Sequence, residues 1–253
     1  TDGINVSGCS VGYTITEDSS APVAPSGLST SPASPGQSGA PTIKGNADGV
    51  TVEVFAGACG GTAIVTGSAL AFATSGLRLV KADGTDFITT DGSTIFFARA
   101  IDAAGNPSAC TSITYTRDTA PPESPVITSA GPSATANDNR PVVKGTGEAA
   151  ATIEIYSAAN CPTAKFVKAD AVALFASTGI PVDVAADTTT EFSAIAVDPA
   201  GNKSACSAAV TYTEDSTIPL PPTALVVSPG PVGQSNSPVI QGVAEATARI
   251  ELF

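Results

Sequence analysis

Short segments that alternate apolar and polar residues recur along the chain and predict β-strands. In the segment VTVEVF, apolar residues at 50, 52 and 54 alternate with Thr51 and Glu53, and the segments at 151–155 and 248–252 alternate in the same way. A period of two with one polar face is typical of a half-buried strand. We therefore expect the apolar side chains of all three segments in a core: Val50, Val52, Val54, Ala151, Ile153, Ile155, Ala248, Ile250 and Leu252.

A second alternating segment, TIFFARAID, recurs as TEFSAIAVD. Its matching apolar positions are predicted to lie in the core: Phe96, Ala98, Ala100, Phe192, Ala194 and Ala196. Its other face differs between the two copies and is predicted to be exposed: Phe97, Arg99, Ser193 and Ile195. Gly, Pro, Asn and Asp separate such segments at intervals of about 8–12 residues, and no segment shows a convincing helical period. The pattern predicts an all-β protein.

The chain is internally repetitive. AIDAAGNPSAC at 100–110 returns as AVDPAGNKSAC at 196–206, and a shortened copy, TDGINVSGC, opens the chain. The cysteines that end these segments are 101 residues (110 − 9) and 96 residues (206 − 110) apart, which suits one compact domain per period. We predict whole repeats at 20–118 and 119–215, the end of a preceding repeat at 1–19 and the start of a following one at 216–253. This frame predicts a window from a longer array.

About seven short strands per period predict tandem immunoglobulin-like β-sandwich domains in an extended array. The repeated Asp-x-x-Gly-Asn segment falls between the sixth and seventh strands. Gly105 and Gly201 permit a positive φ there, and Asp102 and Asp198 can cap the turn with side-chain hydrogen bonds. The motif is therefore predicted to form a turn that each domain needs once.

Each complete repeat contains two cysteines at matching places, which predicts the disulfides Cys59–Cys110 and Cys161–Cys206. Cys9 would pair with a residue outside this sequence. Zinc binding is disfavoured because the chain has no His and no CxxC motif. Disulfides persist outside the reducing cytosol, so the cysteines predict an extracellular or cell-surface protein.

Composition excludes several classes of function. The net charge of −12 disfavours nucleic-acid binding, and no apolar run is long enough to span a membrane. An enzyme is not expected, because the chain lacks His, a GxSxG elbow and a phosphate-binding glycine loop.

The segments PTIKGNADGVTVEVF, AIDAAGN and AVDPAGN and the linkers EDSSAPVAP and RDTAPPESP resemble the tandem bacterial Ig-like domains of large secreted surface proteins and adhesins. The resemblance covers the whole chain. It implies a non-enzymatic stalk or filament, as part of a cell-surface adhesin, that contacts other copies or neighbouring Ig-like domains. The alternative is a module that binds a surface receptor, another protein or a glycan.

The linkers between repeats carry acids that are candidates for calcium binding. In an Ig-like sandwich the first strand begins at the end of the domain that holds the sixth-to-seventh turn. Two sets of oxygen ligands are then expected to meet: Asp18 with Asp102 and Asn106, and Asp118 with Asp198 and Asn202. Carboxylate, amide and backbone oxygens suit Ca²⁺, which the resemblance also implies at such junctions. The alternative is that these acids are solvated and keep the chain soluble.

Overall fold

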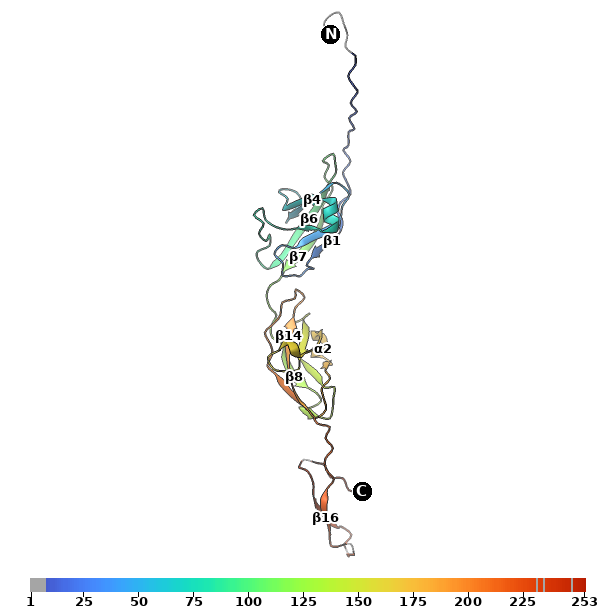
Figure 1. Cartoon of the computed structure of the whole chain (residues 1–253), viewed down its shortest axis with the longest axis vertical. Helices are drawn as coiled ribbons and strands as arrows, with labels where there is room; N and C mark the ends of the chain where they lie inside the picture. The colour runs from blue at the N-terminus through green and yellow to red at the C-terminus, as the bar shows by residue number, and fades with distance from the viewer. Residues whose placement is uncertain (1–7, 231, 234, 247) are drawn as a thin grey trace, which may run out of the picture. The chain divides into compact units, whose positions relative to one another are not determined.

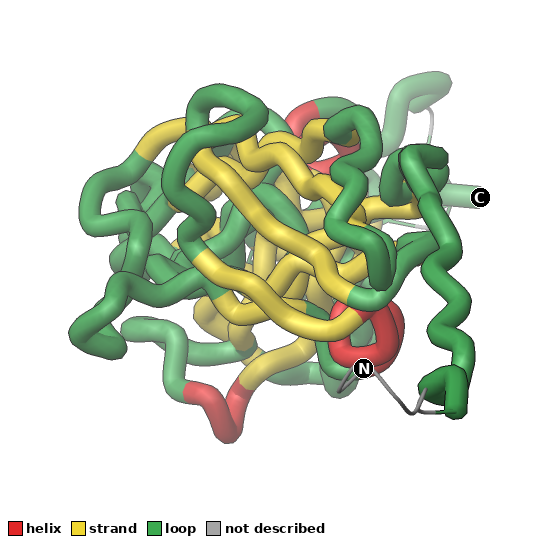
Figure 2. Tube along the Cα trace, turned by 90° about the horizontal axis from the view of Figure 1, so that it is seen from above, coloured by secondary structure: helices red, strands yellow, loops and turns green. Residues whose placement is uncertain are grey.

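The computed structural model describes residues 8–230, 232–233, 235–246 and 248–253, and these form mainly strands and loops (Figures 1 and 2). Contacts divide the chain into two compact units. The first comprises the residues up to Pro122 together with Val197–Ser204, and the second comprises Glu123–Ala196 together with Ala205–Phe253. The predicted repeat boundaries remain predictions, and residues 1–7 of the first predicted segment lie outside the described residues.

The first unit contains two antiparallel sheets. One has the order β1-β2-β5, formed by Ser26–Ser31, Thr42–Asn46 and Leu77–Arg78. The other has the order β4-β3-β6-β7, formed by Val65–Ser68, Thr51–Ala56, Gly92–Ile101 and Thr111–Arg117. Apolar side chains from both sheets meet in one buried cluster, so the unit is a β-sandwich.

The second unit repeats this plan. Its smaller sheet has the order β13-β10-β8, formed by Ile180–Pro181, Val142–Thr146 and Val126–Ala130. Its larger sheet has the order β12-β11-β14-β15-β9, formed by Phe166–Ala171, Thr152–Tyr156, Thr189–Val197, Val210–Glu214 and Thr135–Ala136. Strand β9 runs parallel to β15, and the other pairs with a known register are antiparallel. The all-β, tandem immunoglobulin-like sandwich is confirmed.

The predicted core residues of the sixth strand are confirmed in both units, since all six are at most 1% exposed. In the alternating segments at 50–54 and 151–155, four predicted core residues are fully buried: Val52, Val54, Ile153 and Ile155. The prediction for Val50 is wrong. Val50 is 55% exposed because it precedes β3 and belongs to the turn that leads into it.

The third alternating segment does not form a strand. Residues Thr223–Ser228 (β16) and Val239–Val243 (β17) make a two-stranded sheet, and no described residue of 248–253 belongs to a strand. Ala248 is half-buried, Ile250 is 48% exposed and Leu252 is 67% exposed, so their predicted core positions are wrong. The segments at 51–56 and 152–156 lie in four- and five-stranded sheets, whereas the described part of 216–253 offers 248–253 no such sheet.

Both sandwiches contain a short helix that the alternating pattern did not predict. Helix α1 (Ala69–Thr74) begins after Ser68, whose hydroxyl accepts a hydrogen bond from the Ala71 amide. Helix α2 (Val172–Ala176) occupies the matching place in the second unit, and a 3-10 turn, η1 (Thr163–Lys165), precedes β12. Each α-helix is too short to display a helical period in the sequence.

Each helix contributes one phenylalanine to the centre of its sandwich. Phe72 and Phe175 are both fully buried. A glycine lies opposite each ring: a Cβ added at Gly45 would lie 2.9 Å from Cε1 of Phe72, and one added at Gly145 would collide with Phe175. The glycine in the repeated segments PTIKG and PVVKG therefore leaves the space that the aromatic ring fills.

Candidate functional site

The repeated Asp-x-x-Gly-Asn segment forms a closed hydrogen-bonded turn in each sandwich. The Asp102 carboxylate accepts hydrogen bonds from the backbone amides of Ala104 (2.9 Å) and Asn106 (2.8 Å). The Asp198 carboxylate accepts one from the backbone amide of Asn202 (2.8 Å). Each aspartate also accepts from the side-chain amide of its asparagine, at 3.0 and 2.8 Å. The aspartates therefore have the turn-capping contacts that the sequence predicted.

The glycine of each turn has the backbone conformation expected for it. Gly105 has a φ of 95° and Gly201 a φ of 87°, a region that favours glycine. The backbone amide of each glycine donates to the carbonyl of the turn's aspartate. The two turns are thus built alike.

The side-chain amides of the two asparagines also reach the linkers. Nδ2 of Asn106 donates to the backbone carbonyl of Asp18 (2.9 Å), and Nδ2 of Asn202 donates to the backbone carbonyl of Asp118 (3.1 Å). The linker carboxylates point elsewhere, since that of Asp18 accepts from the Ser20 amide at 3.0 Å. Each linker acid thus makes a local turn and presents its carbonyl to the asparagine.

The structure brings the six predicted calcium ligands into these two groups, but through backbone carbonyls and amide donors rather than through converging carboxylates. Within the described ranges, no three or more His, Cys, Asp or Glu side chains form a group that could hold a metal ion. Calcium binding remains a prediction. It is tested by whether the melting temperature rises in millimolar Ca²⁺ and falls with a chelator.

Sequence reasoning missed a second aspartate in each sandwich. Asp91 accepts hydrogen bonds from the backbone amide (3.2 Å) and hydroxyl of Thr119 and pairs with Arg117 (2.9 Å). Asp187 accepts in the same way from Ser216 (backbone amide, 2.9 Å) and Thr217 (hydroxyl, 2.9 Å). One signal was present, because each aspartate lies five residues before the matched phenylalanine of the sixth strand (96 − 91 and 192 − 187).

Hydrogen bonding lowers the pKa values of the turn aspartates. The side-chain amide of Asn106, followed by its backbone amide, holds the pKa of Asp102 below its ordinary value. Burial on its own would raise the pKa of Asp198, but the hydrogen bonds from Asn202 and the turn backbone outweigh it, so that pKa is also lowered. Both carboxylates are stabilised in their ionised form.

The aspartates that hold the linkers behave in the same way. The Thr119 hydroxyl is the largest cause of the lowered pKa of Asp91, and the Thr217 hydroxyl is the largest cause of the lowered pKa of Asp187. The four aspartates of the turns and beside the linkers therefore have lower pKa values in the folded chain than in the unfolded chain: Asp91, Asp102, Asp187 and Asp198.

These four groups predict a loss of stability in acid. A carboxylate whose pKa is lower in the folded state contributes stability above its unfolded pKa and loses it as the pH falls through the folded value. These groups should leave the urea concentration at the unfolding midpoint unchanged between about pH 5 and 8. When the pH is lowered below about 4, that urea concentration should decrease. Urea titrations at several pH values measure this, and an unchanged midpoint at about pH 2.5 would contradict it.

The two predicted disulfides are present. Cys59 pairs with Cys110 and Cys161 with Cys206, with Cα–Cα distances of 6.2 and 5.9 Å. Each joins the loop after the third long strand to the start of the segment that leads into the last strand of its sandwich. Cys9 is exposed and free.

The outer face of the larger sheet is covered, so the prediction that it is exposed is wrong. In the second unit Ser193 is fully buried and Ile195 is 8% exposed. The loop that carries Cys161 lies over this face, because the hydroxyl of Ser193 donates to the Ala158 carbonyl and accepts from the Cys161 amide (3.1 Å).

In the first unit the same face is covered by a charged side chain. Phe97 and Arg99 are half-buried. The Arg99 guanidinium lies 5.0 Å from the ring centre of Phe55 and pairs with Glu53. Phe55 itself is only 1% exposed.

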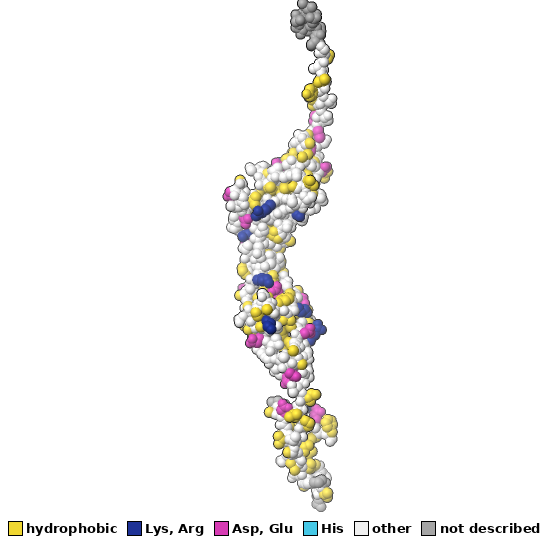
Figure 3. All heavy atoms as spheres, in the orientation of Figure 1, with side chains coloured by type: hydrophobic (Ala, Val, Ile, Leu, Met, Phe, Trp, Pro, Cys, Tyr) yellow, Lys and Arg dark blue, Asp and Glu magenta, His cyan; other side chains and the backbone are white. Residues whose placement is uncertain are grey.

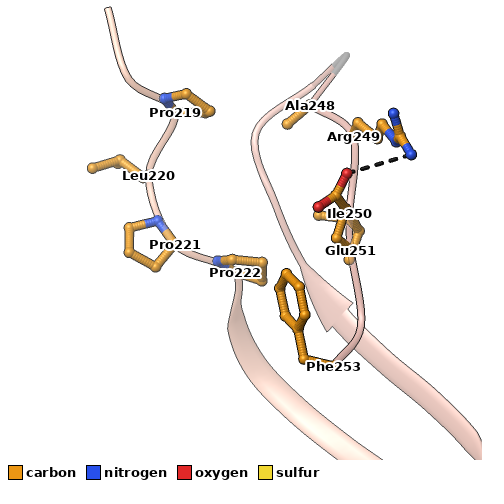
Figure 4. Close-up of a pocket in the computed structure, with 9 residues that line it drawn as sticks. All are labelled: Pro219, Leu220, Pro221, Pro222, Ala248, Arg249, Ile250, Glu251 and Phe253. Carbon is orange, nitrogen blue, oxygen red and sulfur yellow. Dashed lines mark ion pairs between the residues drawn. The ribbon is translucent and has the colours of Figure 1, made fainter.

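Charged side chains are scattered in the view of Figure 3, and the visible surface is mostly uncharged. A hollow of about 310 Å³ lies between the segments 219–222 and 248–253 (Figure 4). Its one ion pair, Arg249–Glu251, is exposed, and the other labelled side chains are apolar. Among the described residues, no helix combines the length and the apolar character needed to cross a bilayer.

Comparison with known proteins gives structural similarity only. No profile of a known family matches the chain, and no curated protein matches it. The FN1-FN3 domains of chicken CNTN1 match 77% of this chain and 66% of theirs, with 13% identity and a TM-score of 0.47. Fibronectin(III)-like modules of Clostridium thermocellum CbhA match 74% of this chain and 94% of theirs, with 12% identity and a TM-score of 0.45.

A tetra-tandem repeat from the extending region of a large adhesion protein matches 75% of this chain and 47% of that chain, with 20% identity and a TM-score of 0.30. All three TM-scores are below 0.5. The assignment of the fold therefore rests on the sheet topology and the cores described above.

Proposed function

We propose that this chain is a non-enzymatic, extracellular structural and interaction protein: a segment of a stalk or filament in a cell-surface protein of the adhesin type. Its partners are other copies or neighbouring Ig-like domains, with a surface receptor or a glycan at the end of such an array. The observation that supports this most is the repetition of one sandwich with its disulfide, its turn and its linker contacts. Repetition of one domain along a chain suits a spacer.

The disulfides support both the location and the mechanical role. They favour an oxidising compartment outside the cytosol. They also shorten the length of chain that tension can extract, because the residues between two bonded cysteines cannot be pulled out. A stalk that limits its own extension in this way keeps what it carries at a bounded distance from the surface.

Force spectroscopy of the full chain tests this proposal. We expect two discrete unfolding events, one for each sandwich. Reduction should add about 180 Å to the extension of the first and about 160 Å to that of the second, from sequence separations of 51 and 45 residues at about 3.6 Å per residue. A chain that extends smoothly, with no discrete event, would refute the stalk proposal.

A second function, ligand binding, is favoured by one local difference between the sandwiches. The loop between the fifth and sixth strands is longer in the first unit, where it forms a small hairpin with a bridge between Val80 and Asp86. Ile64, Val80 and Phe87 contribute apolar side chains to a hollow of about 440 Å³ beside it. We expect any ligand of this module to contact that hollow, and titration with a panel of glycans followed by NMR at Phe87 tests this. Ligand binding that persists after the loop is shortened to the length of its counterpart would exclude this site.

A further inference from the structure

The asparagine of the Asp-x-x-Gly-Asn turn makes a contact that the turn itself does not need. The turn closes through the aspartate and the backbone amides around the glycine. The second hydrogen of the asparagine amide leaves the turn and reaches a linker carbonyl more than 80 residues away in the sequence, at Asp18 for Asn106 and at Asp118 for Asn202. The same long-range contact therefore occurs in both copies of the motif.

The linker whose carbonyl accepts this hydrogen bond also donates hydrogen bonds through its backbone amides. At the second linker, the amide of Asp118 donates to the Gly36 carbonyl (3.0 Å), that of Thr119 to Asp91 (3.2 Å) and that of Ala120 to the Asp118 carboxylate (3.0 Å). Three consecutive amides thus have acceptors. The carbonyl of Asp118 is then held by the asparagine.

The aspartate positions the asparagine for this contact. Nδ2 of Asn202 donates both to the Asp198 carboxylate (2.8 Å) and to the Asp118 carbonyl (3.1 Å), and Asn202 is only 8% exposed. With both amide hydrogens used, the side chain is fixed in one orientation. A small or purely apolar residue at this position could not bridge the turn and the linker.

We propose that the Asp-x-x-Gly-Asn turn is a linker clamp, in which the asparagine amide holds the carbonyl of the linker acid and so removes the linker's flexibility. The linker acid contributes its carbonyl to the clamp, while its carboxylate makes the local turn that presents that carbonyl. The clamp would give the motif a role in the stiffness of the array. This role rests on the proposed stalk function, whereas the clamp itself does not.

The clamp is tested by backbone ¹⁵N relaxation on the full chain. In the unchanged protein we expect order parameters of about 0.85 at Thr119 and Ala120, as in rigid backbone, and values below about 0.6 in Asn202→Ala. Asp198→Asn should lower them as well, because both oxygens of Asp198 accept hydrogen bonds from Asn202 and the variant puts an NH2 donor in place of one of them. The matched control is Asn106→Ala, which removes the same side chain from the other copy of the turn and should leave Thr119 and Ala120 rigid.

The first copy of the turn supplies a reciprocal variant, Asn106→Ala. Asn106→Ala should loosen Ser20 and leave Ala120 rigid, whereas Asn202→Ala should do the reverse. Urea midpoints verify that each variant is folded. Linker order that is unchanged in both alanine variants, or that falls equally at Ser20 and Ala120 in each of them, would overturn the clamp. Neither result depends on the force measurement, so the clamp and the stalk proposal can fail separately.

Discussion

Replacement of Phe72 by alanine is expected to lower the free energy of unfolding of the first sandwich by about 3–5 kcal/mol, as for other fully buried phenylalanines. The ring is completely buried and packs against the position where Gly45 has no side chain. Its loss would leave a cavity between the two sheets that the short helix α1 cannot fill. Urea denaturation followed by circular dichroism measures the change.

The same helix provides a matched control. Leu70 lies in α1 two residues earlier and is 73% exposed. Leu70→Ala removes a large apolar side chain from the same element without opening a cavity, so its effect should stay within about 0.5 kcal/mol. Similar losses in the two variants would mean that helix propensity, rather than the buried ring, determines stability here.

Removal of the Cys161–Cys206 disulfide is expected to cost the second sandwich about 4 kcal/mol. In the chain-entropy model a bond across 45 residues restricts the unfolded chain by roughly that amount. The double variant Cys161→Ser with Cys206→Ser should also loosen the loop over the outer face, because the Cys161 amide would lose its fixed position near Ser193. Thermal unfolding and hydrogen exchange at this loop measure the two effects.

Cys9 supplies the control for the chemistry of the substitution. It is exposed and unpaired. Cys9→Ser should therefore leave the unfolding curve unchanged. If the double variant were as stable as Cys9→Ser, the bond would contribute no stability, and compactness of the reduced unfolded chain would be the first explanation to examine.

Alternation identified strands that have one face in the core, because such a face imposes a period of two on the sequence. It worked for β3, β6 and β11, and in β14 it placed the core face correctly although the other face is also buried. It failed at Val50, where the apolar residue continues the pattern by one position into the preceding turn. The ends of a strand depend on turn geometry, which a hydrophobic pattern does not encode.

The outer face illustrates a different limit. Ser193 and Ile195 differ from their counterparts Phe97 and Arg99, which suggested solvent exposure. Both faces are in fact covered. A loop covers the face with Ser193, and the Arg99 side chain lies over Phe55 on the corresponding face of the first unit. Variability at a position shows that the two neighbourhoods differ, and it does not show that either is solvated.

The sequence predicted which residues of the candidate site lie together, but not which of their atoms make the contacts. Spacing and topology correctly placed Asp18 near Asn106 and Asp118 near Asn202. They could not reveal that a linker acid contributes its carbonyl rather than its carboxylate, because that choice depends on the local turn from Asp18 to Ser20. The holding aspartates at 91 and 187 escaped notice because they precede a strand and belong to no periodic pattern.

The close approach of Gly45 to Phe72, and of Gly145 to Phe175, has a consequence for descent. A methyl group added at either glycine would collide with the ring and also with a backbone oxygen of the neighbouring strand, that of Ser26 or Val126, so a smaller ring alone would not accommodate it. The exposed loop tip at 81–86 can change in length without disturbing the core, whereas each glycine is fixed by the ring and by the strand backbone together. A glycine followed by a phenylalanine 27 or 30 residues later (72 − 45 and 175 − 145) would therefore outlast the linkers as a mark of common ancestry among distant copies of this domain.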